Sequence, residues 1–311
     1  MQPDIVAIGE PMVEFNHQGD RAYLQGFGGD TSNFAIAAAR QGAGVGCFTG
    51  LGADAYGRMF LDLWDAEGVD ASRVKTDPDA FTAVYFVTHG EAGHAFSFLR
   101  AGSAASRIAP ADLPRDYIAG AGLVHFSGVS LAISASSCDA CFAAADIARA
   151  NGALVSFDTN LRLKLWPKAR ARAVILEAMA LSDICLPSLD DMTELTGIED
   201  PDALVDLALK KGARIVALKL GAKGALVANA AQRHRIAPFP VRAVDATGAG
   251  DTFGGAFVAR LRAGDDLVVA GRYAAVAAAL STTGYGAVAP IPHAAAVRAA
   301  LATWESALAG R

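Results

Sequence analysis

Short apolar runs alternate with longer runs of helical spacing through the middle of the chain. From about residue 120, each short β-rich run is followed by a helical one. These segments are 123–126, 134–150, 154–158, 168–181, 183–186, 201–211 and 215–220. Strands that alternate with helices in this way usually pair in parallel, with helices on both faces of the sheet. The pattern therefore predicts a doubly wound α/β protein with a mainly parallel sheet.

The first third of the chain contains strands of a different kind. After an initial strand at 5–9, short runs with polar breaks follow in pairs, with no helix between the two members of a pair. They are 12–15 with 23–27, and 84–88 with 95–99. We expect the two excursions, about 11–27 and 83–100, to form a small inserted antiparallel sheet. Such a sheet can close as a lid over the carboxyl edge of the main sheet. From residue 249 the pattern is mostly alanine-rich helix.

Composition excludes several classes of protein. With 311 residues, 53% hydrophobic and 19% charged, the chain can bury a large core, which excludes a disordered tail or a disulfide-stapled miniprotein. We expect one α/β domain over residues 1–311. The 27 basic and 32 acidic residues give a net charge of -5, and no block of like charge stands out. Nucleic acid is therefore not an expected partner.

The chain also lacks the marks of secretion and of membrane insertion. Four cysteines are too few for a disulfide framework in a chain of this length and suit a reducing compartment. The N-terminus has no basic region of the kind that opens a signal peptide. Two long uncharged stretches, 117–138 and 273–297, are interrupted by Gly, Ser, Thr or Pro, so we interpret them as buried core. We expect a cytoplasmic protein that does not contact a membrane.

The strongest local signal for chemistry lies at 244–257. Gly248, Ala249 and Gly250 lead directly into an apolar helical run, so their amides can point at an anion from a helix N-terminus. A carboxylate in such a cradle repels phosphate, so Asp251 is better explained as a base that takes the proton of an attacking hydroxyl. The alternative is an ordinary acidic residue in the first turn of a helix, and spacing alone does not separate the two.

Other nucleotide and hydrolase motifs fit poorly. Gly248, Gly250 and Gly254 mimic a dinucleotide fingerprint, but that motif belongs after the first strand of a βαβ unit rather than before a helical tail. No Gly-Lys pair occurs, so there is no Walker A sequence, and the H-E-x-x-H and G-x-S-x-G patterns are also missing. A P-loop NTPase, a zincin and an α/β hydrolase are disfavoured.

A second cluster precedes a helical run at 34–40. Gly28 and Gly29 let backbone approach a ligand, and Asp30 and Asn33 offer the acceptors and donors that a polyol requires. A capped helix start explains Asp30 equally well. Alone, this segment does not define a site.

Together the two clusters resemble the ribokinase-like (PfkB) family of carbohydrate kinases. The resemblance covers essentially the whole chain and includes the Gly-Leu-Gly-x-Asp-x-x-Gly run at 50–57. In that family the Gly-Ala-Gly-Asp segment, here 248–251, forms the anion hole for the transferred phosphate, and its aspartate is the catalytic base. The resemblance implies an ATP-dependent, Mg²⁺-dependent sugar kinase in which Asp251 is the base and residues 28–33 bind sugar.

Within the family, segments 27–31, 100–104 and 158–166 look most like 2-keto-3-deoxygluconate kinases. That likeness places Arg100, Arg162 and Tyr85 at the sugar. A sugar acid carries a carboxylate that arginine binds in bidentate fashion, whereas a neutral ketohexose gives no reason for two guanidinium groups. The alternative is that Arg162 contacts nucleotide phosphate and that Arg100 is a surface residue of the lid.

The nucleotide side rests on the resemblance as well. Lys219, Gly221 and Gly224 match the family's nucleotide turn, although an ordinary hairpin explains the same glycines. Asn160 and Tyr273 are expected at the nucleotide, with Tyr273 in the adenine pocket.

The metal positions depart from the family pattern in one respect. The usual Asn-x-x-Glu is Ser188-Leu189-Asp190-Asp191 here, so Asp191 is expected to hold a water of Mg²⁺. Some relatives bind a monovalent cation such as K⁺ beside the Asp-x-Thr segment. In this chain that places it at Asp245 and Thr247.

The sequence thus predicts a kinase that transfers phosphate from ATP to the terminal hydroxyl of 2-keto-3-deoxygluconate. A kinase of a neutral sugar such as fructose, tagatose or ribose is the nearest alternative. A non-catalytic sugar-binding regulator and a dinucleotide oxidoreductase are less favoured. Lid strands in this family commonly pair between subunits, so a homodimer through the lid is expected.

Overall fold

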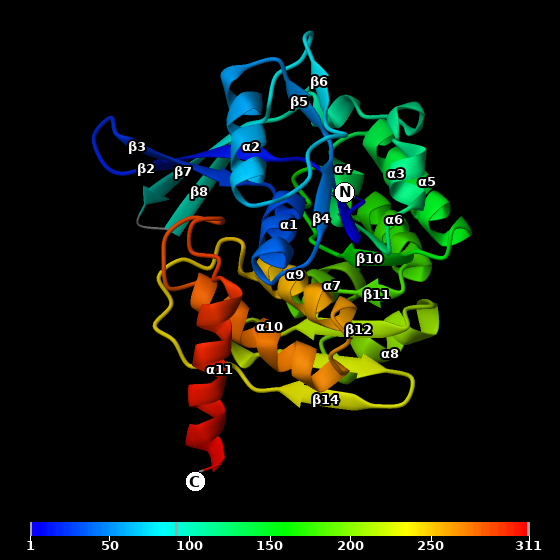
Figure 1. Cartoon of the computed structure of the whole chain (residues 1–311), viewed down its shortest axis with the longest axis vertical. Coiled ribbons are helices and arrows are strands. Elements are labelled where there is room, and N and C mark those ends of the chain that lie inside the picture. Colours follow the sequence, from blue (N-terminus) through cyan, green and yellow to red (C-terminus); the bar gives the residue numbers. More distant parts are fainter. Residues whose placement is uncertain (1, 91–92, 310–311) are drawn as a thin grey trace.

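In the computed structural model, which describes residues 2–90 and 93–309, an eight-stranded sheet crosses the centre of the protein (Figure 1). Its strand order is β14-β13-β12-β11-β10-β9-β1-β4. Six neighbouring strands, from β12 to β4, are parallel, while β13 and β14 run antiparallel at one edge. The strands are β1 (Ile5–Ile8), β4 (Val45–Phe48), β9 (Leu123–Ser127), β10 (Leu154–Asp158), β11 (Ile184–Cys185), β12 (Ile215–Lys219), β13 (Ala225–Asn229) and β14 (Arg233–Ile236).

Helices cover both faces of this sheet. One face carries α3 (Arg115–Ala119), α4 (Gly128–Ala132), α5 (Ala135–Ala150), α6 (Lys168–Leu181), α7 (Leu189–Thr196) and α8 (Pro201–Lys211). The other carries α1 (Asp30–Arg40), α2 (Ala55–Ala66), α9 (Ala249–Arg262), α10 (Leu267–Ser281) and α11 (Ala294–Ala309). Buried side chains fill both layers, so the strands are apolar on both sides, as a parallel sheet requires.

Helices α1 and α9 lie unusually close together. A Cβ added at Gly255 would meet the carbonyl oxygen of Phe34 at 2.4 Å and the Cβ of Ala37 at 2.8 Å. Only glycine at 255 permits this approach. The contact brings the N-terminal ends of the two helices, which contain Asp30 and Asp251, to the same edge of the sheet.

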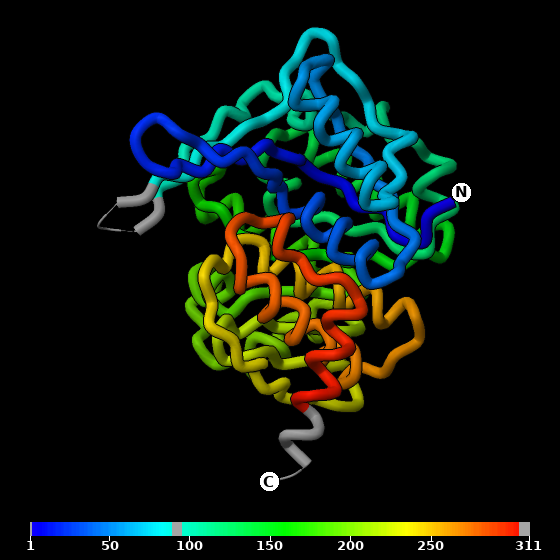
Figure 2. The backbone as a smooth tube through the Cα atoms, turned by 60° about the vertical axis from the view of Figure 1, so that its left-hand side comes forward, coloured from blue at the N-terminus to red at the C-terminus, as the bar shows by residue number. Residues whose placement is uncertain are grey.

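A separate four-stranded sheet, the lid sheet, extends from the main body (Figures 1 and 2). Its strands are β3 (Tyr23–Gly28), β2 (Met12–His17), β7 (Val84–Gly90) and β8 (Gly93–Leu99), in that order. The predicted small inserted sheet is therefore confirmed, but its pairing is mixed rather than wholly antiparallel. The two hairpins are antiparallel, and they join through a parallel β2–β7 pair. Both excursions leave the body in the same direction, so their first strands pair in parallel.

Two smaller features complete the fold. Strands β5 (Gly50–Gly52) and β6 (Lys75–Asp77) form a two-stranded parallel sheet. Asp54 caps α2 by accepting from the amide of Gly57 and also accepts from the amide of Thr82, just before β7. These hydrogen bonds hold the segment that leads into β7 of the lid sheet against the start of α2.

Among the described residues, none of the helices is both long enough and apolar enough to span a bilayer.

Candidate active site

Asp251 lies in the first turn of α9, directly after the Gly248–Gly250 turn. Its Oδ2 accepts a hydrogen bond of 2.8 Å from Nδ2 of Asn33 in α1. Oδ1 of Asn33 is buried and has no hydrogen-bond partner among the described residues. A buried, unpaired acceptor beside a carboxylate is a place where a ligand hydroxyl can donate.

The environment of Asp251 favours the protonated form. Burial, together with the nearby carboxylates of Asp30 and Asp158, raises its pKa to about 7, while the Asn33 hydrogen bond and Lys219 act in the opposite direction. A general base works best when its pKa lies near the operating pH. A pKa of about 7 is what the predicted role of Asp251 as a general base requires at neutral pH.

Asp30 and Asn160 are joined directly. Nδ2 of Asn160 donates to Oδ2 of Asp30 at 2.7 Å. Asn160 has a φ of 26°, a left-handed conformation that asparagine tolerates better than most residues. Backbone strain of this kind is often retained at functional sites. We expected Asn160 on the nucleotide side. The structure instead pairs it with Asp30, which belongs to residues 28–33, the expected sugar segment.

Lys219 and Asp158 form an ion pair at the carboxyl edge of the sheet. They are the last residues of β12 and β10, which flank β11, and Nζ of Lys219 contacts Oδ2 of Asp158. Nζ also lies 3.6 Å from the position that a Cβ at Gly250 would take. The structure therefore places a cation against the turn that precedes Asp251.

The turn before α9 is braced by a second loop. Gly248 has a φ of 75°, and a Cβ there would meet the carbonyl oxygen of Ala287 at 2.9 Å. Asp245 connects the two segments, since Oδ1 accepts from the amide and hydroxyl of Thr247 and Oδ2 from the amide of Gly286. These hydrogen bonds hold the amides of residues 248–251 at the helix N-terminus, where the helix dipole favours an anion.

The lid sheet contributes Tyr85 and Glu14. The hydroxyl of Tyr85 donates to Oε2 of Glu14, and it occupies the space that a Cβ at Gly28 would need. Burial raises the pKa of Glu14 and that of Tyr85. The predicted residues Gly28 and Tyr85 are thus in direct contact.

The two arginines expected at a sugar carboxylate differ in their surroundings. Arg100 is largely buried and ion-paired with Glu10, whose carboxylate also accepts from Oγ of Ser103 at 2.6 Å. Arg162 is exposed, and its Nη1 donates to its neighbouring carbonyl at Leu161. Glu10 thus compensates the charge of Arg100, while the expectation that Arg100 binds a sugar carboxylate stays a prediction.

Asp191 organises the loop after β10. Its Oδ2 accepts from the amide of Leu161 at 3.1 Å and from the hydroxyl of Thr159 at 3.4 Å. Ser188 caps α7 by accepting from the amide of Asp191. The serine that replaces the family's asparagine thus serves as a helix cap, and Asp191 faces the segment that contains Asn160.

The structure contradicts the expectation for Tyr273. Its side chain is 4% exposed, its hydroxyl donates to Oε1 of Gln41 at 2.8 Å, and its ring packs under Arg260. Tyr273 is therefore core packing between helices rather than part of an adenine pocket. Alanine-rich α10 offers few landmarks, and a lone tyrosine in it fits either role from sequence.

Gly221 and Gly224 lie in the turn between the antiparallel strands β12 and β13. The hairpin alternative is therefore correct as a description of the backbone. Gly224, with a φ of 87°, packs against the carbonyl oxygen of Ile236. The hairpin begins at Lys219, so it still borders the site.

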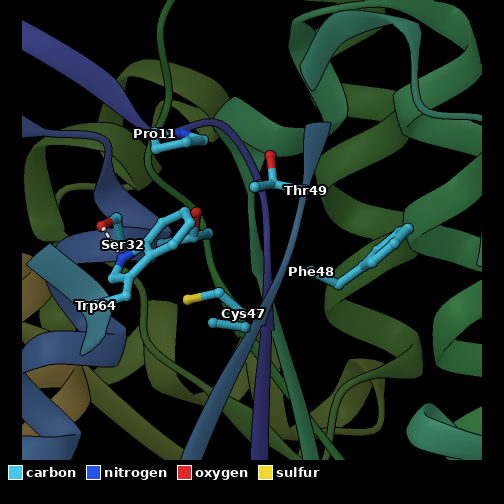
Figure 3. A pocket seen from close by; sticks show the side chains of 9 residues that line it. Pro11, Ser32, Cys47, Phe48, Thr49 and Trp64 are labelled. Atoms are coloured by element: carbon cyan, nitrogen blue, oxygen red, sulfur yellow. Dashed lines mark hydrogen bonds between the residues drawn. The ribbon is translucent and has the colours of Figure 1, made fainter. Parts of the chain in front are cut away.

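A small cavity lies behind the expected sugar segment (Figure 3). It offers about 10 Å³ to the centre of a water molecule, and Nε1 of Trp64 donates to Oγ of Ser32 at its wall. This space suits a single water and not a sugar. The cavity lies between α1 and its neighbours and is too small to be the substrate site.

Sequence reasoning missed three buried acidic residues in this region: Glu10, Glu14 and Asp158. Glu10 follows β1 and Asp158 ends β10, so both lie at the carboxyl edge where such sheets bind ligands. Their positions directly after β1 and at the end of β10 could have identified both residues from the sequence. Glu14 had none, because it lies mid-strand in the lid sheet and its partner Tyr85 comes from a distant strand.

Comparisons with known proteins agree with this geometry. The model of the pfkB family carbohydrate kinases matches residues 2–294, so the chain belongs to that family. A 2-dehydro-3-deoxygluconokinase from Thermoproteus tenax is 36% identical over 274 residues, covering 84% of this chain and 83% of the relative. The probable fructokinase-4 of Arabidopsis thaliana is 32% identical over 308 residues and covers 93% of each.

Solved structures share the fold over nearly the whole chain. A PfkB protein from Polaromonas sp. JS666 has a TM-score of 0.87 at 32% identity, covering 96% of this chain and 99% of that one. A putative ribokinase II from E. coli in complex with ATP and Mg²⁺ has a TM-score of 0.90 at 27% identity, covering 97% and 99%. A fructokinase double mutant from Vibrio cholerae O395, with fructose, ADP and potassium bound, has a TM-score of 0.87 at 29% identity, covering 96% and 98%. The fold is ribokinase-like, and the chain is a carbohydrate kinase.

Proposed function

We propose that this kinase phosphorylates the terminal hydroxyl of 2-keto-3-deoxygluconate, with MgATP as the phosphoryl donor. The observation that carries the kinase chemistry is the placement of Asp251. Its carboxylate has a pKa near neutrality and lies between a helix N-terminus and the amide of Asn33. A base beside an anion-binding turn is the arrangement that transfer of a phosphoryl group to an alcohol requires.

Each group in the site has a step to perform. Asp251 accepts the proton of the sugar hydroxyl as its oxygen attacks the γ-phosphorus of ATP. The amides of residues 248–251 and the ammonium of Lys219 stabilise the charge that develops on the transferred group. Between turnovers, Asp158 holds Lys219 beside the turn through their ion pair.

Sugar recognition is assigned to the segment that begins at Gly28. Gly28 and Gly29 bring backbone to the sugar, while Asp30 and Asn33 bind hydroxyl groups. The buried, unpaired Oδ1 of Asn33 supports this assignment, because a hydroxyl donor would satisfy it. Tyr85 forms the lid side of the same pocket through its contact with Gly28.

The choice of an acid sugar is supported by Arg162. Its guanidinium has no acidic partner among the described residues, and it follows Asn160, which pairs with Asp30. An unpaired guanidinium beside the sugar segment matches a carboxylate. The similarity to the 2-dehydro-3-deoxygluconokinase of Thermoproteus tenax favours the same substrate, while the similarity to the probable fructokinase-4 keeps a neutral ketose as the second candidate.

Cations are assigned from the chemistry of the side chains. Asp191 supplies the hard oxygen that Mg²⁺ prefers, and one carboxylate suffices for an ion that keeps several waters and binds ATP phosphates. Asp245 and Thr247 present a carboxylate and a hydroxyl between two braced loop segments, which suits a monovalent ion such as K⁺. For the nucleotide, Gly221 and Gly224 border the phosphates from the β12–β13 hairpin.

We also propose a homodimer through the lid sheet. Phe96, Phe98 and Leu99 are 39%, 41% and 59% exposed, and the rings of Phe96 and Phe98 stack at 6.3 Å. A contiguous apolar surface of this kind is costly in water unless a second copy covers it. Analytical ultracentrifugation of Phe98→Glu, expected to be monomeric, tests the assignment.

The experiment that tests the substrate measures kcat/KM for 2-keto-3-deoxygluconate, fructose, tagatose and ribose under saturating MgATP. We expect the acid sugar to be preferred. A preference for a neutral ketose would overturn the acid assignment and retain the kinase. Absence of turnover on all four, with ATP bound, would instead favour a sugar-binding regulator.

A further inference from the structure

Three of the four chain crossings between the body and the lid sheet meet around one buried carboxylate, and the fourth leads from β6 into β7. Glu10 joins β1 to β2, Gly29 follows β3, and Arg100 follows β8. The side chain of Glu10 is completely buried, and the carbonyl oxygen of Glu10 lies 2.3 Å from the position of a Cβ at Gly29. Its carboxylate contacts Nη2 of Arg100 and accepts from Ser103.

The charges of Glu10 and Arg100 cancel within the protein. Arg100 is 12% exposed, and its guanidinium lies 5.7 Å from the centre of the Phe98 ring, on the lid sheet. Two charges buried in contact are stable only as a pair, because loss of one partner leaves an uncompensated charge away from water. A substrate carboxylate would therefore meet a neutral unit at Arg100, in contrast to the unpaired cation at Arg162.

The pair also has the right connectivity for a mechanical role. Glu10 is continuous with β1, which lies between β9 and the edge strand β4 of the main sheet, and Arg100 is continuous with β8, an edge strand of the lid sheet. The ion pair thus fastens the β8 edge of the lid sheet to the main sheet at the carboxyl end of β1. The backbone contact at Gly29 adds the sugar segment to the same point.

We propose that Glu10 and Arg100 form a buried strut that fixes the angle of the lid sheet, and that Arg100 is a positioning residue and not the ligand of a substrate carboxylate. This inference rests on the proposed sugar-kinase function. It changes which arginine confers acid selectivity and assigns a role to Glu10.

The decisive variant is the double substitution Glu10→Gln with Arg100→Met. It removes the guanidinium without changing the net charge of the pair, so a change in acid selectivity cannot come from an uncompensated Glu10. We expect KM to rise by a similar factor, on the order of tenfold, for an acid sugar and a neutral ketose alike. KM for ATP should be unchanged. Arg162→Met is the matched control, because it should lower kcat/KM for the acid only.

Hydrogen exchange gives a readout that needs no substrate. The amides of β2, β7 and β8 should exchange faster in Arg100→Met and in Glu10→Gln than in the parent, while those of β9 and β10 should not. The double variant should be closer to the parent than either single one, since no unpaired charge remains. Arg58→Met, which breaks the exposed pair with Asp62, should leave the lid unchanged.

Three outcomes would overturn the proposal. The first is a tenfold or larger loss of kcat/KM for the acid alone in the double variant. The second is unchanged lid exchange in both single variants, and the third is failure of the double variant to fold. A single variant that does not fold beside a double variant that does would support the strut. If the parent phosphorylates only neutral sugars, the acid assignment fails, yet lid exchange still decides the role of the pair.

Discussion

Nδ2 of Asn33 donates to Oδ2 of Asp251 at 2.8 Å, across 218 positions of sequence. The bond links the N-terminal turn of α1, which contains the proposed sugar-binding residues Asp30 and Asn33, to the first turn of α9, which contains the proposed base Asp251. It exists because Gly255 lets α9 approach the backbone of Phe34. In the proposed mechanism, substrate recognition and proton transfer therefore share the side chain of Asn33.

Asp251→Asn removes the proton acceptor and keeps the size of the side chain. We expect kcat to fall by about 10²–10⁴ while the fold and sugar affinity are retained. Steady-state kinetics with a sugar-binding titration measures both. A loss below about tenfold would show that Asp251 is not the base.

The rate should depend on pH through the same carboxyl. Burial raises the pKa of Asp251 to about 7, and only the deprotonated form accepts a proton. Activity should therefore be full above this pKa and fall by about tenfold per pH unit below it. A profile of kcat/KM from pH 5 to 9 gives the position of the acid limb.

Two variants should move the acid limb of the kcat/KM profile in opposite directions. Asn33→Ala removes a hydrogen bond that favours the charged form, so the limb should shift to higher pH. Asp30→Asn removes a nearby negative charge, so it should shift to lower pH. Shifts of the same sign would mean that the limb reports another group.

Gly248 and Gly250 should respond differently to alanine. At Gly250 a Cβ meets Lys219 at 3.6 Å, an ordinary contact, whereas Gly248 has a φ of 75° and faces a carbonyl oxygen at 2.9 Å. Gly248→Ala should lower the free energy of unfolding by about 1–2 kcal/mol, and Gly250→Ala should not. Gly250→Val should crowd Lys219 and lower kcat more than sugar affinity. Urea denaturation and kinetics of the three variants check this order.

Arg162→Met tests the substrate class directly. It removes a charge and keeps much of the apolar stem, so an acid sugar should lose about 1.5–3 kcal/mol of binding while a neutral ketose loses none. KM for ATP is the control, because Arg162 facing a nucleotide phosphate would raise that value instead. Equal treatment of acid and neutral sugars would leave only the sugar-kinase function.

Gln41 should matter for stability although it is far from the base. It follows α1, is buried, donates to the carbonyl of Pro292 at 2.9 Å and accepts from Tyr273. Gln41→Ala leaves two buried polar groups unpaired and should lower the free energy of unfolding by about 1–3 kcal/mol. Gln232→Ala, which breaks an exposed contact with His234, should change it by less than about 0.5 kcal/mol. Equal effects of the two would contradict the assignment.

The order of strands and helices could be predicted from the sequence, because the hydrophobic period of each segment is a local property of the chain. Strand β10 and helices α6 and α8 have the expected bounds, and the helical last third is present. The antiparallel β12–β14 edge was not predicted, because the Gly-Ala-Lys-Gly turn at 221–224 resembles a nucleotide loop in sequence and a hairpin was only the alternative. The parallel β2–β7 pair was missed because the two strands are far apart in the sequence, and no local pattern shows which strands of the two hairpins will pair.

The site was only partly predictable for a related reason. Asp251 and Asn33 stand in motifs, so their types and spacing identify them. The partners that change their chemistry come from other strands: Glu10 neutralises Arg100, Asp158 holds Lys219, and Gln41 removes Tyr273 from the surface. Each of these pairs joins residues that are distant in the sequence, so it cannot be deduced from a single sequence.

Helix α1 is engaged at both ends, and this fixes its length. Asn33 donates to Asp251 at one end, while Arg40 at the other donates to the carbonyls of Val288 and Ile291 in the loop that braces Gly248. Its 11 residues span about 16 Å. Removing one would shorten it by about 1.5 Å and turn one end by about 100° relative to the other, so both attachments could not be kept. The length of α1 therefore sets the separation between Asn33 and the loop that contains Val288 and Ile291, and an inserted or deleted residue should be tolerated better in an exposed turn such as 18–22 than within this helix.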